Sequence, residues 1–357
     1  MNPTLINDGN YLDIVKTLVA DERNVPRGTN LQNIPSRGPG ERVRNTFKPL
    51  PGCVFLGGDL GQIEPRIQAD IMYREYGDNS LRQIFLDGVD LYSTMAERTF
   101  GLAPEYCVDK AYDPTGTFKP RGMMKTGVLA KSYDQSKGAF AKKMGVTDDV
   151  AEHFFTSFDE AFPSFSTMVR DIREGMTVAG YVETLLGRRK RFPKYKEIAA
   201  AVERDNAKLQ RLYNTRRSLA AKRNPSANEV ARLQTVQDEI DVLAEQRGWV
   251  NYWLRAAFNG VIQGTGADIL KMIGIENAAL CKARGWEFNA SIHDEVKNTV
   301  PLADLTPETV DMFRKIMTET FTMSVPIVTD IVIETAWMVE YSPDAWDFEN
   351  KRPKEAA

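Results

Sequence analysis

The stretch "VFLGGDLGQIEPRI", residues 54–67, passes from one structural pattern to another at a single carboxylate. Its first five residues are apolar or glycine, as in a buried strand, and they place Asp59 at the end of that strand. Pro65 then suits the first turn of a helix, in which isoleucine recurs every four residues from Ile63 onward. The local order is therefore strand, acid, helix.

A second acidic stretch, "SIHDEVKN" at residues 291–298, lies within what otherwise resembles a strand. His293 is one of only two histidines in the chain, and it directly precedes Asp294 and Glu295. Because neighbours in a strand point to opposite faces and like charges repel, a bound cation is the simplest physical reason for this cluster. A solvated hairpin tip is the alternative interpretation.

The composition is that of an ordinary globular protein. The chain has 357 residues, of which 42% are hydrophobic and 27% charged, so it is long enough for two or three domains. No run approaches the roughly 20 apolar residues of a membrane helix, and no basic and then apolar leader opens the sequence. Three scattered cysteines without a CxxC pair argue against a zinc site or a disulfide framework. We therefore expect a cytoplasmic protein without a membrane partner.

The formal net charge of −3 argues against a uniformly basic nucleic-acid coat, but it conceals local patches. Residues 119–143 carry seven cationic side chains against one acid, and "GRRKRFP" at 187–193 is a second basic cluster. Acidic stretches elsewhere offset both clusters. The sequence thus predicts a polarised surface, although charge runs are more often solvated faces.

Two helical patterns carry chemistry at four-residue spacing. Residues 119–145 are predicted to form one long helix, one face of which carries Arg121, Lys125, Leu129 and Tyr133. This order suits a nucleotide that lies along the helix. Its triphosphate would bind the two cations, and its base would lie near Leu129 and Tyr133. An amphipathic surface helix with a chance basic stripe is the alternative. A later array of donors, suited to minor-groove acceptors, consists of Arg255, Asn259 and Gln263.

Residues 194–248 are richer in Ala, Lys, Arg and Glu than the rest of the chain, and they are predicted to form a helical hairpin. "KRNPSANE" at 222–229 interrupts them, with Ser226 and Glu229 spaced as a capping box. Residues 194–223 carry nine cations against three acids, whereas residues 224–248 carry two against five. The basic helix is predicted to contact DNA or a partner chain; a merely solvated hairpin is the alternative.

Several motifs together resemble family A DNA polymerases. "DLGQIEPRI" (59–67), "RGMMKTGVLAKSYDQS" (121–136) and "SIHDE" (291–295) are similar to motifs A, B and C of that family, in the same order. Intervening segments that also resemble the family are "NLQNIP" (30–35), "GERVR" with "NTF" (40–47), "GYVETLLGRR" (180–189) and "AAFNGVIQGTGADILK" (256–271). The resemblance covers roughly residue 23 to the end, apart from the hairpin.

This resemblance implies an α+β fold, with an antiparallel-sheet palm, a helical fingers subdomain and a helical-hairpin insertion. The implied domains are a lead segment (1–29), the first part of the palm (30–88), the fingers (89–254, with the insertion at 194–248) and the second part of the palm (255–357). It also implies template-directed DNA synthesis, in which a nucleotidyl group is transferred from a dNTP to the 3′-hydroxyl of the primer on primer–template DNA, with release of pyrophosphate.

The resemblance implies the following site. Asp59, Asp294 and the backbone of Leu60 hold two Mg2+ ions, for which Mn2+ can substitute. Lys125 is a general acid toward the leaving group and Glu295 a supporting acid. The implied dNTP-binding residues are Arg121, Lys125, Leu129, Tyr133, Glu64, Gln62 and Tyr92, with Glu64 excluding a ribose 2′-hydroxyl. The implied DNA-binding residues are Arg23, Arg255, Asn259, Gln263 and His293.

The chain departs from the family pattern at several positions. Leu129 replaces a usual aromatic residue, Tyr92 a usual histidine, and Asp134 the glycine after Tyr133. "DERNVPRG" lacks the usual "TGRLSS" run. The DNA-binding role of Arg23 is therefore assigned only from the distance between Arg23 and "NLQNIP".

The length before motif A is a further departure. Only 58 residues precede Asp59. The family's thumb and exonuclease domains precede the palm, so we expect a separate polymerase chain to supply them. A split or trimmed phage gene, expressed in the bacterial cytoplasm, would explain this arrangement. The alternatives are a relative of single-subunit RNA polymerases and a non-catalytic DNA-binding remnant.

Overall fold

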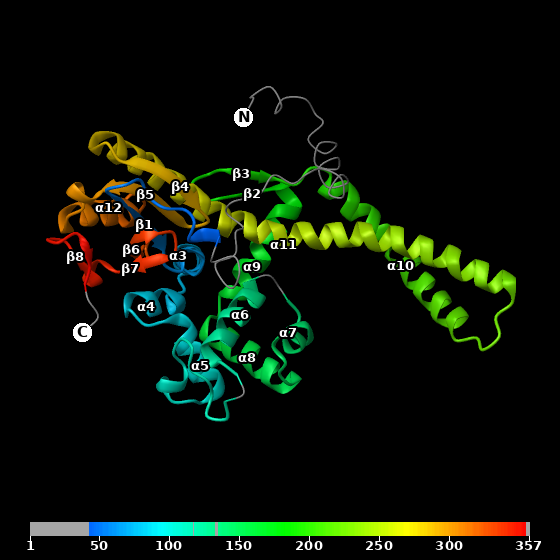
Figure 1. The fold of residues 1–357 in the computed structure, drawn as a ribbon. Helices are drawn as coiled ribbons and strands as arrows, with labels where there is room; N and C mark the ends of the chain where they lie inside the picture. Colours follow the sequence, from blue (N-terminus) through cyan, green and yellow to red (C-terminus); the bar gives the residue numbers. More distant parts are fainter. Residues whose placement is uncertain (1–42, 117, 133–134, 355–357) are drawn as a thin grey trace, which may run out of the picture.

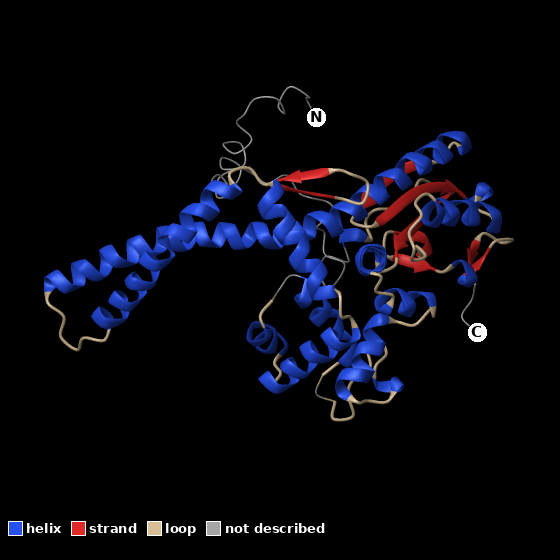
Figure 2. Cartoon of the chain, turned by 180° about the vertical axis from the view of Figure 1, so that it is seen from behind, coloured by secondary structure: helices blue, strands red, loops and turns tan. Residues whose placement is uncertain are grey.

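The computed structural model describes residues 43–116, 118–132 and 135–354. A five-stranded antiparallel sheet lies at one end of the molecule (Figures 1 and 2). Its strand order is β4 (Glu287–Ile292), β5 (Glu295–Pro301), β1 (Cys53–Leu60), β6 (Thr329–Ala336) and β7 (Val339–Tyr341). Helices of the intervening segments surround this sheet, so the predicted α+β class is confirmed. The strand predicted at 54–58 is its central strand.

The two faces of the sheet have different surroundings. Leu56 and Leu60 belong to the main hydrophobic core, and Gly58 between them lies against α12 (Pro307–Glu319). A Cβ atom on Gly58 would lie 3.1 Å from the Phe313 ring, so glycine allows α12 to pack this closely. Alternate residues of β1 point to the opposite face, and Asp59 is one of them.

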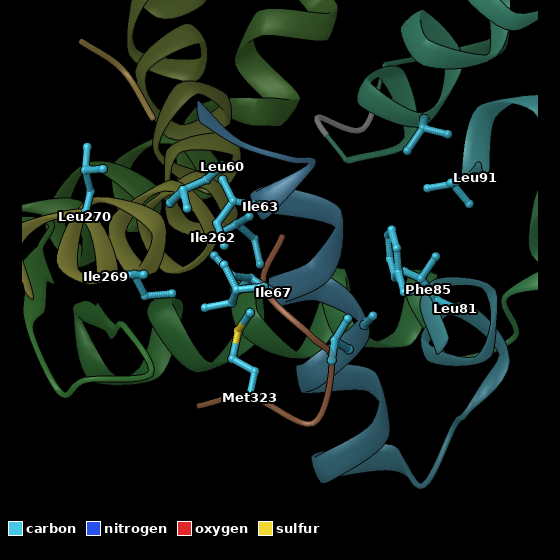
Figure 3. Packing of buried hydrophobic residues seen from close by; sticks show 14 of the residues in the cluster. Leu60, Ile63, Ile67, Leu81, Phe85, Leu91, Ile262, Ile269, Leu270 and Met323 are labelled. Atoms are coloured by element: carbon cyan, nitrogen blue, oxygen red, sulfur yellow. The ribbon is translucent and has the colours of Figure 1, made fainter. Parts of the chain in front are cut away.

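α3 (Ile63–Tyr76) follows β1 directly and packs against the long helix α11 (Ala227–Arg284). Ile63 and Ile67 of α3 point toward Ile262 and Ile269 of α11 (Figure 3). The predicted four-residue repeat of isoleucines is therefore the buried face of a helix. This packing fixes the position of the turn between β1 and α3.

Six helices form the region below the sheet in Figure 1; the first falls in the segment 30–88 of the implied palm and the other five in the segment 89–254 of the implied fingers. They are α4 (Ser80–Leu86), α5 (Leu91–Phe100), α6 (Pro120–Ser132), α7 (Lys137–Met144), α8 (Asp148–Ala161) and α9 (Phe165–Ala179). Stacked and edge-to-face phenylalanines, among them Phe140, Phe154 and Phe158, fill their core. A Cβ atom on Gly127 would come within 2.5 Å of the Phe154 ring, which explains a glycine inside α6.

The prediction of one long helix over 119–145 is wrong. α6 ends at Ser132, and a separate helix begins after Ser136, whose hydroxyl accepts a hydrogen bond from the Ala139 N–H. This N-cap was present in the sequence, but the continuous basic pattern concealed it. Tyr133 and Asp134 lie between the two helices and outside the described residues.

The predicted helical hairpin is confirmed, and its second helix is longer than expected. α10 (Tyr195–Ala220) pairs with the first part of α11 around Leu209, Val236 and Ile240, and both halves of the capping box form. α11 is unbroken over its whole length of 58 residues, about 87 Å, and its second part enters the core beside the sheet. Figure 1 shows the hairpin projecting as an arm away from the sheet. The predicted domain boundary at 254/255 thus lies within one helix.

The remaining short elements complete the chain. The hairpin β2 (Tyr181–Glu183) and β3 (Arg189–Arg191) packs on α11, where Gly260 and Gly264 leave room for Lys190 and Thr184. The others are η4 (Pro104–Tyr106), η5 (Leu302–Asp304), η6 (Pro343–Ala345), β8 (Trp346–Asp347) and β9 (Arg352–Pro353). None of the helices in the described ranges is long and apolar enough to cross a membrane.

Candidate active site

Strand pairing brings four acids together at one end of the sheet. Asp59 lies opposite Glu295 of β5 on one side and opposite Asp330 of β6 on the other. Asp294 precedes β5, and its carbonyl accepts a hydrogen bond from the Leu60 N–H at 3.2 Å. The structure therefore places the two predicted metal ligands side by side, although 234 residues separate them in the sequence.

Negative charge is in excess in this cluster, in which Lys297 pairs with Glu295 at 2.8 Å. Asp59 is exposed at the strand end, yet partial loss of water, the charges of Asp294 and Glu295, a hydrogen bond with Asp294 and the charge of Asp330 raise its pKa to about 7. Among the described residues, no lysine or arginine forms an ion pair with Asp59 or Asp294. The cluster is therefore suited to bind a proton or a cation at neutral pH.

The stretch 291–298 is a hairpin and not a single strand. β4 ends at Ile292, β5 begins at Glu295, and the exposed His293 forms a two-residue turn with Asp294. His293 has a φ of 57°, a left-handed conformation common in such tight turns. The hairpin of the alternative interpretation is therefore present, and its tip carries Asp294 to the end of β1, while a bound cation stays a prediction.

The donor set fits Mg2+. The described residues contain no group of three or more His, Cys, Asp or Glu side chains arranged around one point. Mg2+ does not need such a cage, since it is usually held by one or two carboxylates together with substrate phosphates. Asp59, Asp294 and the Leu60 backbone therefore supply oxygen ligands of the appropriate kind and number.

Glu64 links the acid cluster to α11. It lies in the first turn of α3, and its carboxylate accepts a hydrogen bond from the Gln263 side-chain amide at 3.2 Å. Burial raises the pKa of Glu64, the bond from Gln263 opposes this, and the charge of Asp294 adds to the rise. Two residues predicted for different tasks, nucleotide selection and DNA contact, are therefore direct neighbours.

Asp90, which the sequence did not indicate, holds two predicted nucleotide-binding residues, Arg121 and Gln62. It accepts two hydrogen bonds from Arg121, both at 2.9 Å, and one from Gln62 at 3.1 Å. It also caps α5 by accepting from the Ser93 N–H. Burial alone would raise the pKa of Asp90, but the bonds from Arg121 and Ser93 outweigh burial and lower it.

Tyr92 lies beside Arg121. Its ring is only 6% exposed, and the Arg121 guanidinium lies 5.5 Å from its centroid. A contact between Tyr92 and a nucleotide remains a prediction.

The predicted face of α6 is present as far as the structure describes it. Lys125 is exposed and forms no ion pair with a described residue, and Leu129 is 37% exposed one turn further on. Arg121 is half-buried because Asp90 and Asp109 hold it. Tyr133, the last residue of this predicted face, lies outside the described residues, as does Arg23.

The donor array on α11 lies at the core end of the arm. Arg255 and Gln263 are exposed and Asn259 is half-buried, so four-residue spacing keeps all three on one side of the helix. Because Gln263 reaches Glu64, this face of α11 borders the acid cluster.

Two further residues escaped the sequence patterns. Asp330 becomes recognisable only from the alternation in "TDIVIETA", where Asp330 and Glu334 share one strand face, and only if β6 is known to pair with β1. Lys297, which contacts both Glu295 and Glu334, had no motif to mark it.

Comparisons with known proteins agree with this geometry. The family model "DNA polymerase family A" matches residues 16–339. "DNA polymerase I, thermostable" of Thermus filiformis is 28% identical over 325 residues, which are 90% of this chain and 32% of that protein. "DNA polymerase I" of Lactococcus lactis subsp. lactis is 27% identical over 339 residues, 94% of this chain and 32% of that protein. The chain therefore spans about a third of the length of these relatives.

A solved structure shares the fold. The chain is similar to the "POL domain of Pol1 from M. smegmatis complex with DNA primer-template and dNTP", with a TM-score of 0.63 and 23% identity over 87% of this chain and 45% of that one. Since the family model covers most of the sequence, the chain belongs to DNA polymerase family A.

Proposed function

We propose that this chain catalyses template-directed DNA synthesis by transferring a nucleotide from a dNTP to a primer 3′-hydroxyl. The observation that carries the proposal is the meeting of Asp59 and Asp294, from distant segments, beside Glu64 and Gln263. The family, whose relatives are named DNA polymerase I, supports it. Primer–template DNA and a dNTP are bound to the similar Pol1 domain.

Asp59, Asp294 and the Leu60 backbone would hold two Mg2+ ions, or Mn2+ in their place. When bound, these ions would lower the pKa of the primer 3′-hydroxyl and stabilise charge on the leaving pyrophosphate. Lys125, exposed and without an ion pair to any described acid, binds the triphosphate and donates a proton to the leaving group. Glu295 supports the acid cluster from the opposite strand.

Other side chains position the substrates. Arg121 binds the triphosphate with its guanidinium group, which in this structure donates two hydrogen bonds to Asp90. Gln62 donates to the same carboxylate. Glu64 forms the floor beneath the sugar and excludes a 2′-hydroxyl. Arg255, Asn259 and Gln263 of α11 donate hydrogen bonds to the acceptors of the DNA minor groove. His293 at the hairpin tip contacts the backbone of the primer terminus.

Primer extension tests this function directly. The chain should extend a primer with dNTPs in Mg2+, fail in EDTA, and discriminate against rNTPs. Efficient use of rNTPs would instead favour a relative of single-subunit RNA polymerases, and DNA binding without extension would favour a non-catalytic protein. Repeating the assay with an added thumb- or exonuclease-bearing chain tests the proposed partner. We also propose a phage origin and a cytoplasmic location.

Leu129→Phe is expected to tighten dNTP binding. Leu129 is 37% exposed on the nucleotide face of α6, so a larger side chain has room there. A stacking ring contributes roughly 0.5–1.5 kcal/mol, equivalent to roughly a 2- to 10-fold lower KM for dNTP. Steady-state kinetics measure this change. An increase in KM with an unchanged melting temperature would show that the pocket is shaped around leucine.

The basic arm is expected to bind duplex phosphates. Arg204 and Arg211 are exposed two turns apart on α10, whereas Lys208 between them pairs with Glu239 of α11 at 2.9 Å. Each lost phosphate contact lowers the slope of log K for DNA binding against log salt concentration by about 0.9 in magnitude. The double variant Arg204→Ala with Arg211→Ala should therefore lower this slope by about 1.8. Fluorescence anisotropy across a salt series measures the slope.

Point substitutions suit this test better than removal of the arm, because α11 continues from the arm into the core. Arg232→Ala, on the acidic helix, is the matched control and should leave the slope unchanged. At saturating DNA, the rate of single-nucleotide addition should be that of the wild type. An unaltered slope in the double variant would reject the DNA contact and leave the arm as a solvated or partner-binding hairpin.

A further inference from the structure

A buried lysine lies beside the acid cluster on the open face of the sheet. Lys297 of β5 is only 4% exposed, and its ammonium group contacts two carboxylates, Glu334 of β6 and Glu295 at 2.8 Å. The rings of Phe55 and Trp337 each lie 6.0 Å from it. No step of the function proposed above uses this cation.

Lys297 reaches Glu334 by crossing the central strand. β1 separates β5 from β6, and Gly57 of β1 lies opposite Lys297 on one side and Val332 on the other. A Cβ atom on Gly57 would lie 3.1 Å from the Glu295 carboxylate and 3.6 Å from the Lys297 ammonium group. Glycine at this position therefore leaves the space that the lysine side chain and Glu295 occupy.

Glu334 fixes the far end of this interaction. Its side chain is fully buried, and its second oxygen accepts a hydrogen bond from the Met338 N–H at 2.8 Å. Burial raises the pKa of Glu334, and the contact with Lys297 opposes the rise. Because a buried charge without a partner is costly, the pair holds the ammonium group in one place.

The fixed ammonium group in turn restrains Glu295. Glu295 lies opposite Asp59 in the strand register and directly follows Asp294. Three carboxylates this close repel one another, so a mobile Glu295 would adopt several positions around the two aspartates. Lys297 instead draws one Glu295 oxygen over Gly57, along the sheet and toward β6.

We propose that Lys297 is a positioning residue for nucleotidyl transfer, and that it acts by holding Glu295 in a single orientation beside Asp59 and Asp294. This inference rests on the proposed polymerase function and extends it to a residue outside the family motifs. Groups that orient the residues of a reactive site typically change activity 10- to 100-fold when they are removed.

The test replaces the pair without changing the local net charge. Lys297→Met with Glu334→Gln removes one positive and one negative charge and leaves Glu295 without its partner. The rate of single-nucleotide addition at saturating DNA and dNTP is expected to fall about 10- to 100-fold. The Kd for primer–template DNA should stay unchanged, because none of the proposed DNA contacts is touched. Circular dichroism and melting temperature establish that the variant is folded.

A mutant cycle with Glu295→Gln separates positioning from a structural role. If Lys297 acts through Glu295, adding the pair of substitutions to Glu295→Gln causes no further loss of rate. Losses that add, or a folded pair variant with wild-type rate, overturn the inference.

Should the pair variant not fold, Gly57→Ala takes its place, because its methyl group would lie 3.1 Å from the Glu295 carboxylate, and equally close to Val332, and so pushes against Glu295. It is expected to lower the rate without adding to Glu295→Gln, and an unchanged rate overturns the inference. Failure of the wild type to extend a primer would reject the proposed function, whereas an active wild type with unaffected variants rejects only the role of Lys297.

Discussion

Asp294→Ala is expected to abolish nucleotide addition while primer–template DNA still binds. The substitution removes one of the two carboxylates that converge at the end of β1, and neither is proposed to contact DNA. Loss of a metal ligand forfeits several kcal/mol of charge stabilisation in the transition state, which corresponds to a rate reduction of about 1,000-fold or more. Asp59→Ala should behave in the same way. Single-turnover extension and anisotropy measure the rate and the binding.

Asp330→Ala is the matched control for charge. Asp330 also lies opposite Asp59 and also raises its pKa, but it is not a proposed ligand. It should therefore reduce the rate far less than Asp294→Ala. An equal loss in both variants would mean that the total negative charge matters and not the identity of the ligands. Retained turnover in Asp294→Ala would reject the metal assignment.

Glu64→Ala is expected to admit ribonucleotides. Glu64 lies in the first turn of α3 beside the acid cluster, where it is held by Gln263. A 2′-hydroxyl forced against this side chain would cost about 1–3 kcal/mol of overpacking, so its removal should raise the relative kcat/KM for rNTPs roughly 10- to 100-fold. The ratio of kcat/KM for rNTP and dNTP, measured with one template base, reports the change.

Two variants control this experiment. Glu64→Gln keeps the volume of the side chain and should retain discrimination, whereas Gln263→Ala removes only the hydrogen bond that orients it. Intermediate discrimination in Gln263→Ala would show that the orientation of Glu64 contributes. If Glu64→Ala leaves the ratio as it is in the wild type, the steric role of Glu64 is wrong.

Local features of this protein were predictable because short-range physics decides them. The strand that carries Asp59 near its end and the helix with Pro65 in its first turn follow from apolar runs and from a four-residue repeat, and both are confirmed. The capping box of Ser226 and Glu229 required only their spacing, and both of its hydrogen bonds form. The break at Ser136 was missed because a basic pattern, which is continuous, says nothing about where a backbone leaves the helix.

The sequence by itself therefore determined most of the elements, the family and the residue types of the candidate site, including Asp59, Asp294 and Glu64. Strand register and helix packing decided the rest. They place Asp330 opposite Asp59, attach Gln263 to Glu64, and occupy Arg121 with Asp90. They also carry the Lys297 side chain of β5 across Gly57 of β1 to Glu334 of β6, 37 positions away in the chain. Contacts between such distant residues are set by long-range hydrogen bonding and burial. A local pattern of residues does not predict them.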